Sequence, residues 1–287
     1  MNLTDYRDIT ALLQRHDFRF SKSMGQNFLT AAWVPQQIAA ESGITAADGA
    51  LEIGPGVGCL TAELAKRTKK TVSVELDTRL IPVLAETLTD CRNTEVINAD
   101  VLKTDLNALI SEHFPGMRVF VCANLPYYIT SPVIMYLLES RLPIESITVM
   151  VQKEAAERLC APVGSRGAGA ITVAVNYYAE AEHLFYVKRD SFMPSPNVDS
   201  EVIKLTVRKK PPIEVADEEF FFKVVKATFS QRRKTAANGL SSMLGISKND
   251  INEALTAAKL PSAVRAESLT MEQLGTLSNE LREITNG

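Results

Sequence analysis

Short apolar runs alternate with longer amphipathic stretches through the middle of the chain, and this alternation restricts the fold more than any other feature. Runs rich in β-branched residues recur at 50–53, 71–75, 95–97, 118–122 and 146–151. Most of the stretches between them are some fifteen to twenty residues long, which is enough for a crossover helix that joins parallel strands. The pattern therefore predicts a doubly wound α/β fold with a buried, mostly parallel sheet.

Two later runs, 184–187 and 201–207, lie too close together for another crossover helix. Thirteen residues separate them, including Pro194 and Pro196. We expect these runs to form an antiparallel hairpin at the end of the sheet. Such an ending is the architecture of class I S-adenosylmethionine-dependent methyltransferases, which are Rossmann-like, whereas dehydrogenases usually continue with parallel units. The expected fold class rests on this analogy.

The apolar pattern changes after Arg208, Lys209 and Lys210, where Pro211-Pro212 cannot continue a central strand. Helical spacing follows at 217–229, 233–243, 248–258 and 270–284, with Ser247 and Thr270 as expected N-caps. A chain of 287 residues is also long for a single core. We therefore predict one domain at 1–210, which holds the sheet, and a small all-α domain at 211–287.

A glycine-rich segment, with Gly54, Gly56 and Gly58, directly follows the first predicted strand and precedes a helix that opens near Leu60. Glycine allows a tight turn and leaves no Cβ between the main chain and a ligand. The GxGxG spacing differs from the GxGxxG of dinucleotide-binding proteins. A cofactor loop is the preferred interpretation, and a purely structural strand-to-helix turn is the alternative.

Acidic residues follow the next two predicted strands. Glu75 stands about twenty residues after the glycine loop, where a carboxylate can accept hydrogen bonds from ribose hydroxyls. Both NAD and S-adenosylmethionine carry those hydroxyls. S-adenosylmethionine is the preferred cofactor, with Asp100 placed to accept a hydrogen bond from its adenine amino group. A helix cap before Val101 is the structural alternative for Asp100.

The segment Asn124-Leu125-Pro126-Tyr127 ends the fourth predicted strand, where amino-methyltransferases carry an (N/D)PPY-type motif. The Asn124 side-chain oxygen and the Leu125 carbonyl, fixed by Pro126, can hold the two hydrogens of an adenine N6 out of the ring plane. This localises the nitrogen lone pair toward a methyl donor. Once methylated, the nitrogen is acidic enough to lose its proton to solvent, so no dedicated base is required. Tyr127 should stack on an extruded base. A strand-terminating turn followed by core tyrosines is the alternative.

A second aromatic wall is predicted at Phe192, within the proline-rich segment 191–200. An ordinary connection between two strands is about equally consistent with this segment.

The composition places few further limits on function. The formal net charge is −3, but residues from Glu201 onward hold 13 Lys and Arg against 11 Asp and Glu, so RNA contacts must come from local patches. No secretory signal and no apolar run near ~18 residues is present, so a cytoplasmic protein without membrane contact is expected. Cys59, Cys91, Cys122 and Cys160 form no CxxC pair, which predicts reduced, mostly buried thiols and no metal site.

Five segments taken together closely resemble the rRNA adenine N6,N6-dimethyltransferases, and most nearly the KsgA (RsmA) family. They are 25–29, the loop at 52–56, 74–77, 124–128 and 192–200, within a resemblance that runs from Ser21 to the C-terminus. It implies transfer of two methyls to each of two adjacent adenosines near the 3′ end of 16S rRNA in the 30S subunit. It also implies that S-adenosylmethionine binds at Asn27, Leu29, Gly54, Glu75, Asp100 and Asn124.

The resemblance leaves two alternatives, an Erm-type enzyme acting on 23S rRNA and a non-catalytic RNA-binding relative. The long C-terminal region and the segment 130–132 favour the small-subunit enzyme, and the intact catalytic loop argues against a non-catalytic protein. A monomer is expected. The basic residues predicted to contact RNA are Lys22, Arg208, Lys209, Lys210, Arg232, Arg233 and Lys234, the last three opening a helix beside Phe229.

Overall fold

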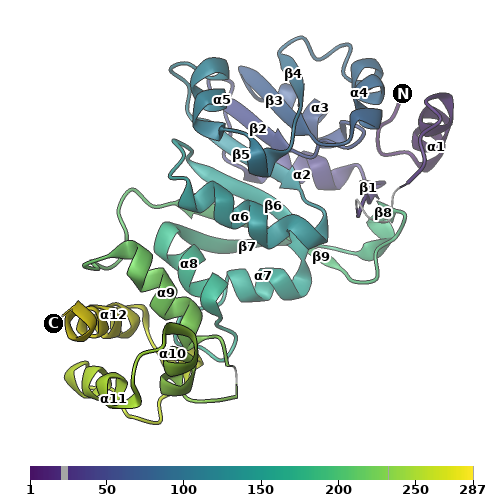
Figure 1. Ribbon diagram of the computed structural model, residues 1–287. Coiled ribbons are helices and arrows are strands. Elements are labelled where there is room, and N and C mark those ends of the chain that lie inside the picture. Colours follow the sequence, from purple (N-terminus) through teal and green to yellow (C-terminus); the bar gives the residue numbers. More distant parts are fainter. Residues whose placement is uncertain (21–24, 232, 287) are drawn as a thin grey trace. The chain divides into compact units, whose positions relative to one another are not determined.

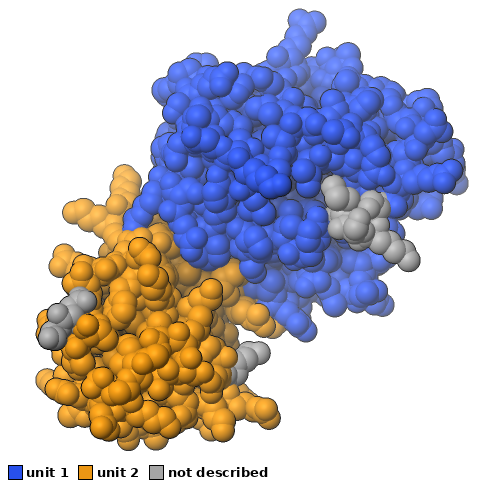
Figure 2. Space-filling model, viewed as in Figure 1, with its two compact units in different colours: residues 1–156, 181–207 blue, residues 157–180, 208–287 orange. Residues whose placement is uncertain are grey.

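The computed structural model describes residues 1–20, 25–231 and 233–286 (Figure 1). Two compact units make up the chain, residues 1–156 with 181–207 and residues 157–180 with 208–287 (Figure 2). In the part of the chain that is described, no helix is both long and apolar enough to cross a membrane.

The first unit is built on a seven-stranded sheet with the order β4-β3-β2-β5-β6-β9-β7. The strands are β2 (Gly49–Ile53), β3 (Lys70–Glu75), β4 (Thr94–Asn98), β5 (Val119–Asn124), β6 (Ser146–Gln152), β7 (Ala179–Val187) and β9 (Ser200–Val207). The first five in this order are parallel, and β9 is antiparallel to β6. This is the predicted class I methyltransferase fold.

The β7–β9 hairpin is also confirmed. The two strands are neighbours in the sheet. His183 within β7 contacts Glu201 at the start of β9, whereas the Arg208 amide that follows β9 donates to the Tyr178 carbonyl before β7. The start of one strand therefore lies beside the end of the other, so β7 and β9 are antiparallel.

Helices connect and cover the strands. They are α1 (Tyr6–Arg15), α2 (Trp33–Glu41), α3 (Cys59–Ala65), α4 (Ile81–Thr87), α5 (Leu106–His113), α6 (Thr130–Glu139) and α7 (Lys153–Leu159). Val34 and Ile38 of α2 share one apolar cluster with Ala50 of β2 and Cys122 of β5. All five residues of β2 are buried, as expected for a central parallel strand covered on both faces.

A two-stranded sheet that the sequence did not predict lies beside the main sheet (Figure 1). It pairs β1 (Phe28–Leu29) with β8 (Phe192–Met193), with Leu29 opposite Phe192. Both residues of β1 are apolar and buried. Their burial against Phe192 and Met193 brings the N-terminal segment next to the hairpin connection.

The second unit is helical. It contains α8 (Ala170–Tyr178), α9 (Glu218–Thr228), α10 (Ala236–Leu244), α11 (Lys248–Ala257) and α12 (Met271–Asn286). The Ser247 hydroxyl accepts a hydrogen bond from the Asp250 amide at 3.2 Å, so the predicted cap of α11 is confirmed. Thr270 and Gln273 exchange two hydrogen bonds of 3.0 and 3.3 Å at the start of α12, which is a capping box.

The second unit begins earlier than residue 211 and includes a helix from the middle of the chain. Arg208 is its first residue after β9, and α8 also belongs to it. The reason lies in aromatic packing, because Tyr178 of α8 stacks on Phe222 of α9 with ring centroids 5.3 Å apart. The Tyr178 hydroxyl also donates to Glu218 at 2.9 Å. Sequence periodicity carries no information on such a pairing between distant helices.

Two smaller expectations are corrected. Helix α10 begins at Ala236 rather than at 233, because Thr235 before it has an extended backbone. Arg233 and Lys234 therefore lie in the connection between α9 and α10 and do not open the helix.

All four cysteines are free, but only Cys122 is buried, and the other three are half-buried near helix ends: Cys59, Cys91 and Cys160.

Candidate active site

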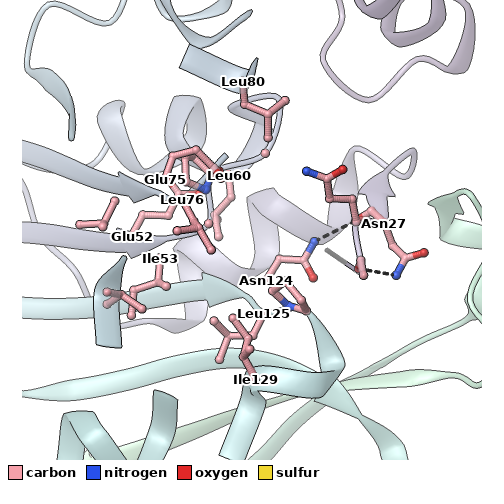
Figure 3. Close-up of a pocket in the computed structure, with 18 of the residues that line it drawn as sticks. Asn27, Glu52, Ile53, Leu60, Glu75, Leu76, Leu80, Asn124, Leu125 and Ile129 are labelled. Atoms are coloured by element: carbon pink, nitrogen blue, oxygen red, sulfur yellow. Dashed lines mark hydrogen bonds between the residues drawn. The ribbon is translucent and has the colours of Figure 1, made fainter. Parts of the chain in front are cut away.

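A cavity of about 300 Å³ lies at the carboxyl ends of β2, β3 and β5 in the first unit (Figure 3). It has the size of a small ligand site. The structure brings every predicted cofactor and catalytic residue to its wall. These residues are Asn27, Leu29, Gly54, Gly56, Glu75, Asp100, Asn124, Leu125, Pro126, Tyr127 and Phe192.

The glycine loop forms the wall at the end of β2. Gly54, Gly56 and Gly58 have φ values of +69°, +60° and +88°, a region that other residues rarely adopt. A Cβ at Gly54 would meet no protein atom within 4 Å, whereas one at Gly56 would lie 3.2 Å from the Phe28 ring. The main chain at Gly54 is therefore open to a ligand, and the loop fits the close approach that a nucleoside cofactor requires.

Glu75 presents a buried carboxylate to this cavity. The residue is only 5% exposed, and its Oε1 accepts a hydrogen bond from the Asp77 amide at 2.8 Å. Burial raises the pKa of Glu75, and hydrogen bonds from the Asp77 and Gly56 amides oppose that shift. The two oxygens of an ionised carboxylate offer about four acceptor positions, so Glu75 can also accept hydrogen bonds from a ligand. The donor set of a ribose fits this carboxylate.

Asp100 is a helix cap that also lines the cavity. Its carboxylate accepts a hydrogen bond from the Leu102 amide at 3.1 Å and caps the short 3₁₀ helix Val101–Lys103. Lys103 Nζ lies 3.4 Å from the other carboxylate oxygen. The residue lines the cavity at the same time. The cap fixes the carboxylate at the cavity edge, so the structural and ligand roles are compatible.

Exposed apolar side chains complete this part of the cavity. Leu76 and Leu102 are 49% and 37% exposed, although large apolar side chains in soluble proteins are mostly buried. Leu76 directly follows Glu75, and Leu102 lies two residues after Asp100. Together they offer apolar surface to a flat aromatic ring. An apolar residue beside each predicted acid was the signal available in the sequence.

Glu52 is a site residue that the sequence analysis did not predict. It is 1% exposed in the middle of β2, and its Oε2 accepts hydrogen bonds from Thr61 Oγ1 at 2.5 Å and Ser73 Oγ at 2.8 Å. Burial raises the pKa of Glu52 to about 7. In the sequence, the signal for Glu52 was a single acidic residue inside an otherwise apolar predicted strand.

The catalytic loop begins at Asn124, the last residue of β5. Its Nδ2 donates to the main-chain carbonyl of Asn27 at 3.4 Å, and Asn27 Nδ2 donates to the Gly25 carbonyl at 3.1 Å (Figure 3). The Asn124 Oδ1 therefore points away from Asn27. Leu125 is buried, and no described residue donates a hydrogen bond to its carbonyl. Two acceptors are thus available at this end of the cavity.

The aromatic residues differ in how they are held. Tyr127 is half-buried, and its hydroxyl lies 2.8 Å from Ser200 Oγ. Burial raises the pKa of Tyr127, so its hydroxyl stays protonated at neutral pH. Phe192 is 5% exposed and sits opposite Leu29 in the small sheet. Tyr128, which also lines the cavity, is 56% exposed.

The predicted RNA-binding residues fall into three groups. Arg208 is held inside the second unit, because its Nη1 lies 2.8 Å from Glu180 Oε1 and its Nε donates to the Asn176 carbonyl at 3.2 Å. The exposed residues are Lys209, Lys210, Arg233 and Lys234. Lys22 and Arg232 lie outside the described residues. The structure thus gives Arg208 an internal ion pair and leaves four basic side chains accessible.

The fold and the cavity together define a class I methyltransferase: a mostly parallel sheet, an antiparallel hairpin, and a glycine loop followed by strand-end acids. Residues 17–283 match the family model described as ribosomal RNA adenine dimethylase, and the chain belongs to that family. Within the described residues, no group of three or more His, Cys, Asp and Glu is arranged to hold a metal ion.

Curated relatives cover almost the whole chain. A protein of Geobacillus thermodenitrificans is 49% identical over 274 residues, which are 94% of each chain. One of Streptococcus thermophilus is 45% identical over 287 residues, or 99% of each chain. Both are named ribosomal RNA small subunit methyltransferase A.

Solved structures show the same fold. A dimethyladenosine transferase from Plasmodium falciparum has a TM-score of 0.71 at 26% identity, covering 90% of this chain and 98% of that one. The 23S rRNA methyltransferase ErmE has a TM-score of 0.66 at 29% identity, covering 89% of this chain and 99% of that one.

Proposed function

We propose that this protein transfers methyl groups to the N6 of two adjacent adenosines near the 3′ end of 16S rRNA, within the 30S particle. The observation that carries the proposal is the position of Asn124 and Leu125. Both residues line the cavity that the glycine loop and Glu75 also line. Methylation of an amino group requires the acceptors that hold the amino group and the residues that bind the methyl donor to lie in one site.

S-adenosylmethionine is the proposed methyl donor and supplies an electrophilic methyl on a sulfonium. Glu75 would accept hydrogen bonds from its ribose, and Asp100 from its adenine amino group. The open main chain at Gly54 allows close approach, and Leu76 and Leu102 offer apolar surface to the adenine ring. Asn27 and Leu29 line the same cavity and complete the proposed set.

The catalytic contribution of the protein is to hold the target amino group. An adenine N6 is a poor nucleophile because its lone pair is delocalised into the ring. Asn124 Oδ1 and the Leu125 carbonyl can accept its two hydrogens and turn the lone pair out of conjugation. The bond from Asn124 Nδ2 to Asn27 orients the amide so that its oxygen is free for this role.

The target base must leave its helix to reach these acceptors. Tyr127 lines the cavity and would stack on the extruded base, with Phe192 as the second wall. Because Phe192 is nearly buried, it offers little surface to a ligand. Tyr127, which is half-buried, is the main stacking surface in this proposal.

RNA contact by the second unit is proposed at Lys209, Lys210, Arg233 and Lys234. Lys234 borders a hollow of about 310 Å³ whose described lining is entirely polar and lacks carboxylates: Gln231, Lys234, Asn238, Ser241, Ser242 and Lys248. Such a donor-rich lining suits a phosphate of an RNA backbone. A ribosomal particle recognised partly by shape would need less total positive charge than free RNA. We further propose that the protein acts as a cytoplasmic monomer.

The small-subunit substrate is favoured over an Erm-type substrate by the relatives. Those named for the small subunit reach 44–49% identity, whereas the ErmE structure shares 29%. A non-catalytic role is disfavoured by the catalytic loop, in which Asn124 and Tyr127 both face the cavity.

The test uses 30S particles that lack the dimethyladenosines and radiolabelled S-adenosylmethionine. Label should enter 16S rRNA, mass spectrometry should locate it on two adjacent adenosines, and Asn124→Ala should abolish it. Label found solely in 23S rRNA would assign the Erm-type function instead. Calorimetry with Glu75→Ala tests the cofactor part separately, because unchanged affinity would contradict the ribose contact.

A further inference from the structure

A hydrogen bond joins the catalytic loop to strand β9, which lies two strands away from β5 in the sheet. The Tyr127 hydroxyl lies 2.8 Å from Ser200 Oγ, although the two residues are 73 positions apart in the chain. Ser200 is completely buried and is the first residue of β9. The predicted function accounts for Tyr127 but gives Ser200 no role.

Ser200 is fixed more firmly than the loop it contacts. It stands opposite Gln152 at the end of a continuous seven-pair register between β6 and β9. The preceding residue, Asp199, accepts a hydrogen bond from the Lys153 amide at 3.1 Å through its carbonyl, and one from the Arg189 amide at 2.9 Å through its carboxylate. The Tyr186 hydroxyl also donates to Asp199. These bonds hold the start of β9 on both sides.

Tyr127, by contrast, stands in the single 3₁₀ turn Tyr127–Ile129, which lies outside the regular sheet. The turn is closed by the bond from the Ile129 amide to the Pro126 carbonyl at 3.1 Å. That bond fixes the main chain but not the two torsions of the tyrosine side chain. Among the described residues, Ser200 is the hydrogen-bond partner of the Tyr127 hydroxyl. The ring orientation therefore depends on Ser200.

We propose that Ser200 is a positioning residue, whose hydroxyl holds the Tyr127 ring in the orientation that stacks on the target base. This inference rests on the proposed function, in which Tyr127 is the stacking surface. A stacking ring fixed before the base arrives loses less conformational freedom on binding than a mobile one. The hairpin strand β9 thus acts in catalysis through the catalytic loop, without touching substrate.

The test compares four variants in methyl transfer to 30S particles: Ser200→Ala, Tyr127→Phe, the double variant and Ser146→Ala. Both single variants remove the same hydrogen bond from opposite sides, and Tyr127→Phe keeps the ring. We expect each to lower kcat about five- to tenfold, the effect of one neutral hydrogen bond, with unchanged cofactor affinity. The double variant should be no slower than either single variant, because the bond is lost only once.

Ser146→Ala is the matched control. Ser146 is a buried serine of the neighbouring strand β6, and its hydroxyl has no hydrogen-bond partner among the described residues. Its variant should keep the wild-type kcat, and thermal unfolding should confirm that all variants are folded at the assay temperature.

The positioning role would be overturned by full activity in Ser200→Ala or in Tyr127→Phe, or by losses that multiply in the double variant. A further variant, Tyr127→Leu, distinguishes failure of the positioning role of Ser200 from failure of the proposed function. If Tyr127→Leu is fully active, the stacking proposal itself fails. If Tyr127→Leu is impaired while Tyr127→Phe and Ser200→Ala are not, only the role of Ser200 is wrong.

Discussion

Asn124 donates its side-chain amide to the main-chain carbonyl of Asn27 across 3.4 Å, a contact between residues 97 positions apart. The bond determines which way the amide faces, because the donor nitrogen and the acceptor oxygen of an Asn side chain diverge from the same carbon. The N-terminal segment therefore orients the acceptor of the catalytic loop.

Replacement of Asn124 should separate its two hydrogen-bonding roles. Asn124→Ala loses acceptor and donor, and we expect methyl transfer to fall by about 100-fold or more. Asn124→Asp keeps an acceptor but faces the Asn27 carbonyl with a second acceptor, so its rate should lie between those of wild type and Asn124→Ala. Single-turnover transfer at saturating cofactor measures these rates. A rate for Asn124→Ala within twofold of wild type would refute the catalytic assignment.

A matched pair of glycine variants tests the cofactor loop. Gly54 and Gly116 have φ values of +69° and +72°, and a Cβ at either would meet no protein atom within 4 Å. Gly54→Ala and Gly116→Ala should therefore cost similar stability, about 1 kcal/mol from backbone strain. Only Gly54→Ala places a methyl group at the cavity wall. Calorimetry should show weaker S-adenosylmethionine binding for Gly54→Ala alone, and equal affinities would argue against close approach at this glycine.

The buried carboxyl of Glu52 should make stability depend on pH. Its pKa rises from the usual 4.5 to about 7, chiefly through burial, with a smaller contribution from the charge of Glu75. Between these two values the folded protein holds a proton that the unfolded chain releases. The stabilising contribution is therefore complete below about pH 4.5 and is lost as the pH rises through about 7. The total is at most roughly 3 kcal/mol.

Glu52→Gln removes this titration while keeping a polar side chain beside Thr61 and Ser73. We expect the variant to gain stability relative to wild type as the pH rises from 5 to 8. Denaturant unfolding without cofactor at both pH values gives the comparison. A difference between variant and wild type that does not change with pH would contradict the raised pKa.

Charge reversal should reveal the RNA surface of the second unit. Arg233→Glu with Lys234→Glu should weaken 30S binding and reduce its dependence on salt concentration, because fewer phosphates are neutralised. Lys69→Glu is the control, since Lys69 is exposed and immediately precedes β3, opposite the strand end that carries Glu75. Binding should be measured at several salt concentrations. An unchanged salt slope in the double variant would exclude this surface.

Much of the first unit follows from local sequence patterns. Buried parallel strands are continuous apolar runs, so the central strands and the hairpin were predictable, and the turn chemistry of Gly54 marked the end of β2. Because the carboxyl ends of parallel strands share one sheet edge, Glu75, Asp100 and Asn124 could be expected in one site. The structure places all three at the same cavity.

Other relationships depend on segments that meet only after folding. The pairing of Leu29 with Phe192, the burial of Glu52 beneath Thr61 and Ser73, and the bond from Tyr127 to Ser200 leave no periodic signal. The same holds for α8, which joins the second unit through its tyrosines.

Local sequence patterns therefore predict the order of the strands along the chain and the chemical groups at their ends, because periodicity and turn residues are local properties. The orientation of those groups depends on tertiary packing. Asn27 aims the Asn124 amide, and Ser200 holds the Tyr127 hydroxyl. Each of these bonds joins residues more than seventy positions apart, and such a bond exists only once packing has brought both segments together.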